Sequence, residues 1–229
     1  IVFPRHTSVV ERRLLVATSA VINCIALVFA SILAGIVFAG FAKERMRERV
    51  SKDMAMAANI QENSIPRVFP PFADERRMDI FATMHTARDV GGDFYDFFFT
   101  APSKVAFLVA DVSGKGVPAA LFMMRAKATI KGETQSGLPL NEVMARVNDA
   151  LSRDNDANMF VTAWMGVIDL ETGEVTFVNA GHNPPIYLGR SGNGEHKFVR
   201  ERSGMMLGAM PGLKYRLHTL HLSPGDMLY

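Results

Sequence analysis

Cysteine is almost absent from this chain, because Cys24 is the single example among 229 residues and it lies within an apolar run. One thiol excludes an intrachain disulfide framework and a zinc site built from several cysteines, and it suits a reducing compartment. A large charge of one sign is also lacking, since the net charge is +2 and the clearest basic cluster is a local one before residue 53. Composition therefore predicts no nucleic-acid-binding surface.

The length allows one main domain with a small addition, because 229 residues are few for two full domains. The sequence begins with Ile1 instead of methionine, and Tyr229 directly follows an apolar run that a Pro-Gly-Asp turn introduces. We therefore expect the sequence to be a fragment of a longer protein.

Acidic and basic side chains are missing from residues 14–42. This run exceeds the roughly 20 residues that an α-helix needs to cross the hydrocarbon core of a membrane. Two basic residues directly precede the run and five lie between Lys43 and Lys52 after it, which favours a cytoplasmic position for the C-terminal side. We expect a membrane-spanning helix here, because the run is too long for the two alternatives, a buried core helix and a signal peptide.

Small side chains recur at every fourth residue of this run, at Ser31, Gly35 and Ala39. Such spacing lets two helices approach closely, so a homodimer through this segment is one hypothesis. The following residues 43–62 lack proline and glycine, and they carry an apolar stripe at positions 46, 50, 54 and 57. A short coiled coil, a helix packed on its own domain and a helix lying on anionic lipid all fit this stripe.

The rest of the chain predicts an α+β domain, which prolines at positions 66, 70 and 71 separate from the connector. Strands interrupted by a pair of helices favour antiparallel sheets over alternating βαβ units. The expected strands are residues 78–84, 93–99, 105–112, 160–169, 175–179 and 186–188, and the expected helices are 117–131 and 140–153. The expected division is a flanking segment 1–13, a transmembrane helix 14–42, a juxtamembrane connector helix 43–66 and a soluble domain 67–229.

Two of the expected strands each have an aspartate at one end. Asp93 opens the first and Asp111 closes the second, with Pro102 midway between them. A hairpin that turns at this proline brings the two carboxylates opposite one another. A shift of one residue in the loop would set Asp93 against Val112 instead, still within reach of a shared ion.

A pair of facing carboxylates is costly unless a cation neutralises it. Carboxylate and carbonyl oxygens select a hard divalent ion such as Mg²⁺ or Mn²⁺. Glycines at positions 91, 92, 114 and 116 let the backbone approach an ion or a phosphate closely. The alternative is that both aspartates are turn caps at strand ends, because two acidic residues are fewer than a complete ligand set.

Four ordered motifs resemble those of the SpoIIE/RsbU branch of PPM-type protein phosphatases. They are Ala-Asn-Ile-Gln at 58–61 leading to Pro66, Ala-Arg-Asp-Val-Gly-Gly-Asp-Phe-Tyr-Asp at 87–96, Ala-Asp-Val-Ser-Gly-Lys-Gly at 110–116, and Asn-Ala-Gly-His-Asn-Pro-Pro at 179–185. The resemblance covers about residues 55–229 and leaves out the apolar run. It implies an antiparallel β-sandwich flanked by helices, with two Mn²⁺ or Mg²⁺ ions at one end of the sandwich.

The resemblance also implies roles for individual residues. Asp111 matches the carboxylate that bridges both metals, Asp93 matches a further acidic ligand, and Val112 matches the position that offers a backbone carbonyl. Asp96 is either an acceptor for metal-bound water or a solvent-exposed strand aspartate. His182 is either an acid or a structural hydrogen-bonding group.

The family pattern places two further metal-binding aspartates beyond the strand that begins at residues 225–229. The sequence ends before them, so we expect the fragment to bind metal weakly and to be poorly active. Asp226 is expected to serve the turn before that strand rather than the missing role.

The resemblance implies hydrolysis of a phosphoserine or phosphothreonine protein, such as a phosphorylated anti-sigma-factor antagonist. Together with the apolar run and its basic flank, this predicts an enzyme of the cell membrane with its phosphatase domain in the cytoplasm. One alternative is a catalytically inactive sensor that binds a partner. Another is a diguanylate cyclase, because residues 91–94 superficially resemble its GGDEF signature. Phe94 occupies the place of the acidic residue that this signature requires.

Overall fold

The computed structural model describes residues 8–69, 71–72, 74–85, 90–190 and 196–229. Residues 87–89 of the second motif, Pro70 and most of the flanking segment 1–13 therefore lie outside the described residues. The chain divides into two compact units, Ile1–Asp53 and Met54–Tyr229, which we treat separately.

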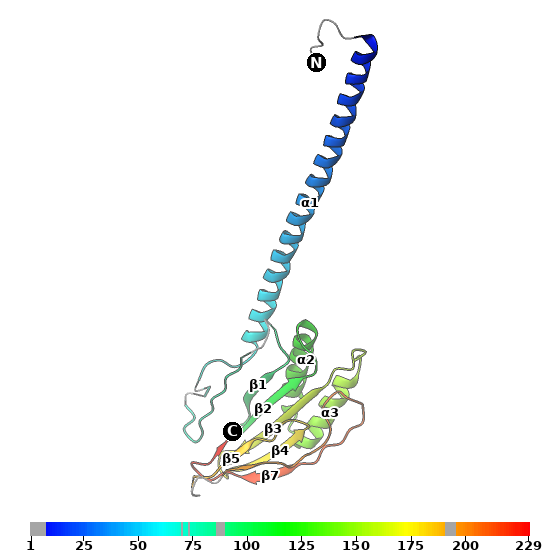
Figure 1. Cartoon of the computed structure of the whole chain (residues 1–229). Helices are drawn as coiled ribbons and strands as arrows, with labels where there is room; N and C mark the ends of the chain where they lie inside the picture. The colour runs from blue at the N-terminus through cyan, green and yellow to red at the C-terminus, as the bar shows by residue number, and fades with distance from the viewer. Residues whose placement is uncertain (1–7, 70, 73, 86–89, 191–195) are drawn as a thin grey trace. The chain divides into compact units, whose positions relative to one another are not determined.

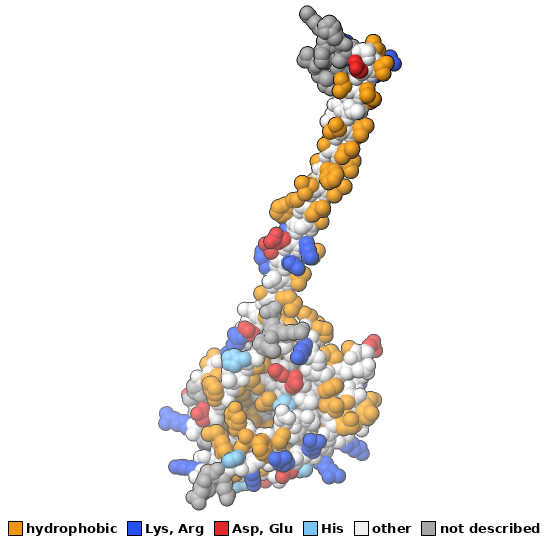
Figure 2. Space-filling model, viewed as in Figure 1, with side chains coloured by type: hydrophobic (Ala, Val, Ile, Leu, Met, Phe, Trp, Pro, Cys, Tyr) orange, Lys and Arg blue, Asp and Glu red, His pale blue; other side chains and the backbone are white. Residues whose placement is uncertain are grey.

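Helix α1 (Val9–Asn63) contains the whole apolar run (Figure 1). It begins with a capping box, in which the Ser8 backbone N–H donates to the Glu11 carboxylate at 2.7 Å and the Glu11 N–H donates to the Ser8 hydroxyl at 3.3 Å. Its most apolar 18-residue window has a mean hydropathy of 2.6 and is not buried against the protein. By length and composition, α1 is thus a candidate membrane span, and Figure 2 shows apolar side chains along it.

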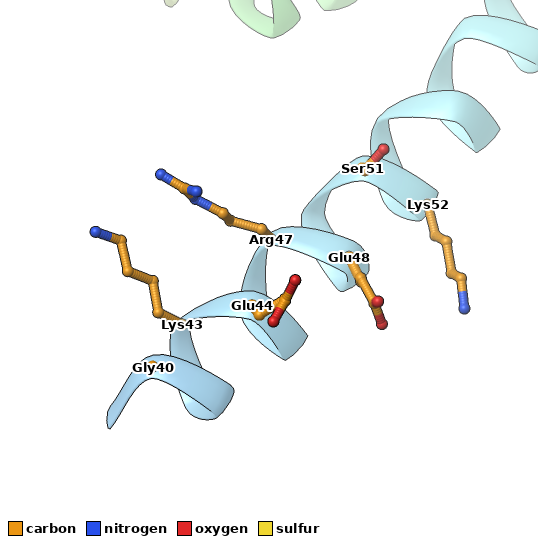
Figure 3. Close-up of a pocket in the computed structure, with 7 residues that line it drawn as sticks. All are labelled: Gly40, Lys43, Glu44, Arg47, Glu48, Ser51 and Lys52. Carbon is orange, nitrogen blue, oxygen red and sulfur yellow. The ribbon is translucent and has the colours of Figure 1, made fainter. Parts of the chain in front are cut away.

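Charged side chains return to α1 directly after the apolar run. Figure 3 shows Lys43 and Arg47 extending to one side of the helix and Glu48 and Lys52 extending elsewhere. A shallow hollow in this stretch is lined by seven residues between Gly40 and Lys52. All of them belong to α1, so the hollow is a stretch of helix surface rather than an enclosed cavity.

The second unit is built on an antiparallel sheet with the strand order β1-β2-β3-β4-β7. Its strands are β1 (Phe94–Ala101), β2 (Lys104–Val112), β3 (Val161–Asp169), β4 (Glu174–Ala180) and β7 (His218–His221). A smaller antiparallel sheet, in the order β6-β5-β8, consists of β5 (Ile186–Leu188), β6 (His196–Phe198) and β8 (Met227–Leu228). The predicted α+β class with antiparallel sheets is confirmed.

Alternating side chains give the large sheet two apolar faces. One face packs against helices α2 (Val117–Thr134) and α3 (Leu140–Ser152), and its core includes the fully buried Phe94, Met123 and Met165. The opposite face supplies Trp164 and Phe177, which pack with residues of the small sheet. Each large apolar side chain buried in this way contributes about 1.5–3 kcal/mol. The result is a β-sandwich with helices outside one sheet, as Figure 1 shows.

The predicted strand at residues 78–84 is wrong, because this segment is irregular. Two of its apolar side chains make contacts outside any sheet, and one of them, Met84, packs against the main core. Phe81 contacts Phe69, which in turn packs on Phe97 of β1 with ring centroids 5.7 Å apart. The short strands β6 and β7 were not predicted, because three or four residues carry too little periodicity to distinguish a strand from a loop.

Asp96 is neither a solvent-exposed aspartate nor a residue beside Asp93 on the sheet. Its side chain lies on the helix-covered face of β1, is only 2% exposed, and forms an ion pair with Lys127 of α2. Its other carboxylate oxygen accepts a hydrogen bond from the Phe97 N–H at 3.0 Å. Asp93 directly precedes β1 and lies three positions before Asp96, so the alternation of an extended chain directs the two side chains to opposite faces. The interpretation of Asp96 as an acceptor for metal-bound water is therefore not supported.

We expect Lys127→Met to lower the free energy of unfolding by about 3–5 kcal/mol, because it leaves the buried Asp96 carboxylate without its partner. The double variant Asp96→Leu/Lys127→Met should recover most of this loss. Lys104→Met, which breaks an exposed ion pair with Asp169, should cost no more than about 1 kcal/mol. Urea denaturation in detergent micelles, followed by fluorescence of Trp164, measures all three. Equal losses for Lys127→Met and Lys104→Met would contradict a stabilising buried pair.

Candidate functional site

The β1–β2 hairpin brings Asp93 and Asp111 together. The strands are joined by the turn at Pro102 and Ser103, and their register pairs Phe94 with Ala110. The next residues along the two strands are Asp93 and Asp111, and their carboxyl groups share a hydrogen bond. The placement expected from the spacing of the two aspartates is found.

The environment of Asp111 disfavours its negative charge. Partial burial, the hydrogen bond with Asp93 and the negative charge of Asp93 together raise the pKa of Asp111 from 3.8 to about 6, and burial contributes most. Both side chains remain accessible to solvent. Two carboxyl groups held this closely need a shared proton or a cation between them, so this end of the hairpin attracts positive charge.

Backbone packing beside the aspartates requires glycine at position 92. A β-carbon at Gly92 would lie 2.8 Å from the Val112 carbonyl oxygen and 2.9 Å from the Val112 β-carbon. No other residue fits this approach without moving one of the two strands. The Val112 carbonyl therefore lies against the residue that precedes Asp93, at the same end of the hairpin.

Thr162 links this end of the hairpin to the turn that carries His182. It pairs with Asp111 across β2 and β3, and its hydroxyl donates to the Asp111 carbonyl oxygen at 3.4 Å. The same hydroxyl lies 2.9 Å from His182 Nδ1. Sequence analysis missed Thr162, because only the register of β3 against β2 reveals it.

Asn179 fixes the position of His182. The His182 N–H donates to the Asn179 side-chain oxygen at 2.8 Å, and the Asn179 amide donates to the His182 carbonyl at 3.1 Å. Between them, Gly181 adopts φ = 75°, a left-handed conformation that favours glycine. Burial lowers the pKa of His182, and the negative charge of Asp93 opposes this shift. His182 thus borders the site with its Nδ1 already engaged by Thr162.

The donor set fits part of the coordination sphere of a hard divalent cation. Two carboxylates and one carbonyl oxygen lie at this end of the hairpin, and Mg²⁺ is commonly held by one or two carboxylates while it keeps several waters. Within the described part of the chain, no group of three or more His, Cys, Asp or Glu side chains could hold a metal ion. A closed zinc site of four protein ligands is therefore absent from those residues.

Asp226 has the structural role that its sequence context predicts. Its carboxylate accepts hydrogen bonds from the Ser223 N–H at 2.8 Å, the Arg190 N–H at 2.9 Å and the Tyr187 hydroxyl at 2.7 Å. These bonds lower the pKa of Asp226, the Arg190 bond most of all. Asp226 therefore ties the turn before β8 to β5.

Residues 101–229 match the family model described as stage II sporulation protein E (SpoIIE). Among curated proteins, the chain is 28% identical over 183 residues to the phosphoserine phosphatase RsbU of Bacillus subtilis, covering 80% of this chain and 53% of that protein. It is 29% identical over 203 residues to protein IcfG of Synechocystis, covering 77% of this chain and 31% of that protein. The chain thus spans about half the length of RsbU and about a third of IcfG.

Solved structures share the fold. The SiaA-PP2C domain of Pseudomonas aeruginosa superposes with a TM-score of 0.61 at 20% identity, covering 80% of this chain and 71% of that domain. At this identity, the likeness concerns the fold alone. It agrees with the helix-flanked sandwich that the second unit forms.

In metal-free protein, we expect Asp111 to make folding less favourable as pH rises. Because its folded-state pKa is raised, its contribution to stability is fully present below 3.8 and is lost as pH rises through about 6. The free energy of unfolding, measured by urea denaturation with a chelator present, should therefore fall across this window relative to Asp111→Asn. An identical pH dependence of the two proteins would contradict the raised pKa.

Proposed function

Because this chain belongs to the SpoIIE family, we propose that it is a metal-dependent protein serine/threonine phosphatase of bacterial signalling. The observation that carries the proposal is the pair of hydrogen-bonded carboxyl groups of Asp93 and Asp111 at the open end of the β1–β2 hairpin. Two acidic groups held together at the cost of mutual repulsion are typical of a cation site. The name of the relative RsbU, a phosphoserine phosphatase, supports the same class of reaction.

In this proposal, Asp111 would be the shared ligand of two Mn²⁺ or Mg²⁺ ions, Asp93 would be a further ligand and Val112 would offer its carbonyl oxygen. When bound, such ions lower the pKa of water and neutralise charge on a phosphate group. Asp111 would hold such an ion in its ionised form, because a ligand carboxyl must be deprotonated. The close packing of Gly92 on Val112 keeps the carbonyl beside the two carboxylates.

Thr162 and His182 border the proposed site on the side of strand β3. The Thr162 hydroxyl ties the Asp111 backbone to His182 Nδ1, which fixes the imidazole ring relative to β2. Burial keeps the pKa of His182 below its usual range, so the ring is neutral at pH 7. A neutral, oriented ring suits hydrogen bonding to a phosphate group or a water molecule better than it suits proton donation.

The proposed substrate is a phosphorylated signalling protein of the anti-sigma-factor antagonist type, by resemblance to the SpoIIE/RsbU branch. We further propose a location in the cell's inner membrane, with α1 as the visible span and the phosphatase unit in the cytoplasm. The apolar run and the basic residues after it support this orientation. The spacing of Ser31, Gly35 and Ala39 supports a homodimer through the span and connector helices, and the apolar stripe after residue 43 is suited to lipid or to a second copy.

An inactive, partner-binding module is the second candidate. It is favoured by the small number of acidic ligands, because the described residues supply two carboxylates at the site. Mn²⁺-stimulated release of phosphate from a phosphoserine protein separates the two candidates, since an inactive module gives no metal-stimulated turnover. Incubation with GTP tests the diguanylate cyclase alternative in the same preparation.

We expect Asp111→Asn to abolish Mn²⁺-stimulated release of phosphate from a phosphoserine protein by the natural full-length protein. The loss should exceed the roughly 10- to 100-fold effect that is usual for residues that only orient a ligand. Asp156→Asn is the matched control, because Asp156 is an exposed carboxylate in the loop after α3. Unchanged turnover in Asp111→Asn, or formation of a cyclic dinucleotide from GTP, would refute the proposed function.

A further inference from the structure

Gln61 is the only residue of α1 that is buried among those described, and it is only 4% exposed. It lies in the last turn of the helix, within the second compact unit. Its side-chain amide donates to the Gly91 carbonyl oxygen at 2.5 Å, and its side-chain oxygen accepts from the Gly91 N–H at 3.1 Å. One carboxamide therefore satisfies both polar groups of a single backbone residue, as a neighbouring β-strand would.

Gly91 is placed where it can control the proposed site. Its neighbour Gly92 packs against the Val112 carbonyl, and the next residue is Asp93. A residue spans at most about 3.6 Å of chain, so two residues leave little slack between a fixed Gly91 and the Asp93 backbone. Fixing Gly91 thus restricts the direction from which the Asp93 carboxyl approaches Asp111.

Attachment of the helix end to the second unit does not depend on Gln61 alone. Ile65 is 6% exposed and belongs to the core between the sheet and helices α2 and α3. The Tyr95 hydroxyl donates to the Pro66 carbonyl oxygen at 2.7 Å. These contacts hold the chain directly after Gln61 through residues other than Gly91, so attachment of the helix end and control of Gly91 are separable by mutation.

We infer that Gln61 is a positioning residue, which sets the affinity of the Asp93–Asp111 site for a divalent cation by fixing the Gly91 backbone. This inference rests on the proposed metal site and adds the means by which the end of α1 acts on it. The last turn of α1 is hydrogen-bonded directly to the approach to β1. A displacement of that turn therefore moves the Gly91 backbone and changes the position of the Asp93 carboxyl group relative to Asp111.

The test measures Mn²⁺ affinity by isothermal titration calorimetry with the natural full-length protein in detergent. Gln61→Met keeps the length of the side chain and removes both hydrogen bonds, and it should weaken Mn²⁺ binding about 10- to 100-fold, as expected for loss of a ligand-orienting residue. Gln61→Glu keeps the acceptor for the Gly91 N–H and loses the donor, so it too should weaken binding. Phosphatase activity of Gln61→Met should return as the Mn²⁺ concentration is raised.

Two controls separate positioning from attachment. Tyr95→Phe removes the hydrogen bond to Pro66 and should leave Mn²⁺ affinity unchanged. Asn63→Asp makes the same amide-to-acid change as Gln61→Glu at an exposed position two residues away and should also leave it unchanged. Equal Mn²⁺ affinity in Gln61→Met and Tyr95→Phe, whatever their melting temperatures, would overturn the inference.

Hydrogen exchange of the unmodified protein provides a test that does not depend on a variant's folding. If the Gln61–Gly91 pair strengthens cation binding, cation binding must strengthen the pair to the same extent. Mn²⁺ should therefore slow exchange of the Gly91 N–H, and an unchanged rate would overturn the inference. If Asp111→Asn binds Mn²⁺ normally, the proposed function fails; if Asp111→Asn loses binding while Gln61→Met keeps it, only the role of Gln61 fails.

Discussion

The repulsion between the Asp93 and Asp111 carboxyl groups is the constraint around which the second unit is organised. The hairpin register places the two groups together, and the pKa of Asp111 rises to about 6 in consequence of burial and of its neighbour. Keeping two such groups in contact requires a rigid frame on both strands. Gly92 packed on Val112, Thr162 bonded to the Asp111 carbonyl, and Gln61 bonded to Gly91 supply that frame.

Two aspartates, Asp93 directly before strand β1 and Asp96 within it, have opposite environments. Asp93 leaves the strand toward the accessible end of the hairpin, whereas Asp96 is buried under α2 and neutralised by Lys127. The buried pair of Asp96 and Lys127 joins the sheet to α2. Among the described residues, no lysine or arginine forms an ion pair with Asp93 or Asp111. Proximity in sequence therefore says little about shared function, because the alternation of a strand separates the two side chains.

Sequence patterns predicted the longer elements well, because periodicity over seven or more residues is a strong signal. Strands β1 to β4 and helices α2 and α3 lie within a few residues of their expected positions. The segment 78–84 was wrongly assigned to a strand, since its apolar side chains make contacts from irregular backbone, Phe81 with Phe69 and Met84 with the main core. The burial of Asp96 could not be predicted, because its partner Lys127 reaches it only through the way α2 lies across the sheet.

By itself, the sequence determined the apolar run and the hairpin that opposes Asp93 and Asp111, because these depend on local spacing along one helix or around one turn. It also determined the α+β class, because the order of strands and helices along the chain is a local pattern. Only the tertiary structure decided that Thr162 bonds to His182, that Lys127 neutralises Asp96 and that Gln61 bonds to Gly91. These pairs join residues 20, 31 and 30 positions apart. Such contacts follow from strand register and helix packing, which no local pattern encodes.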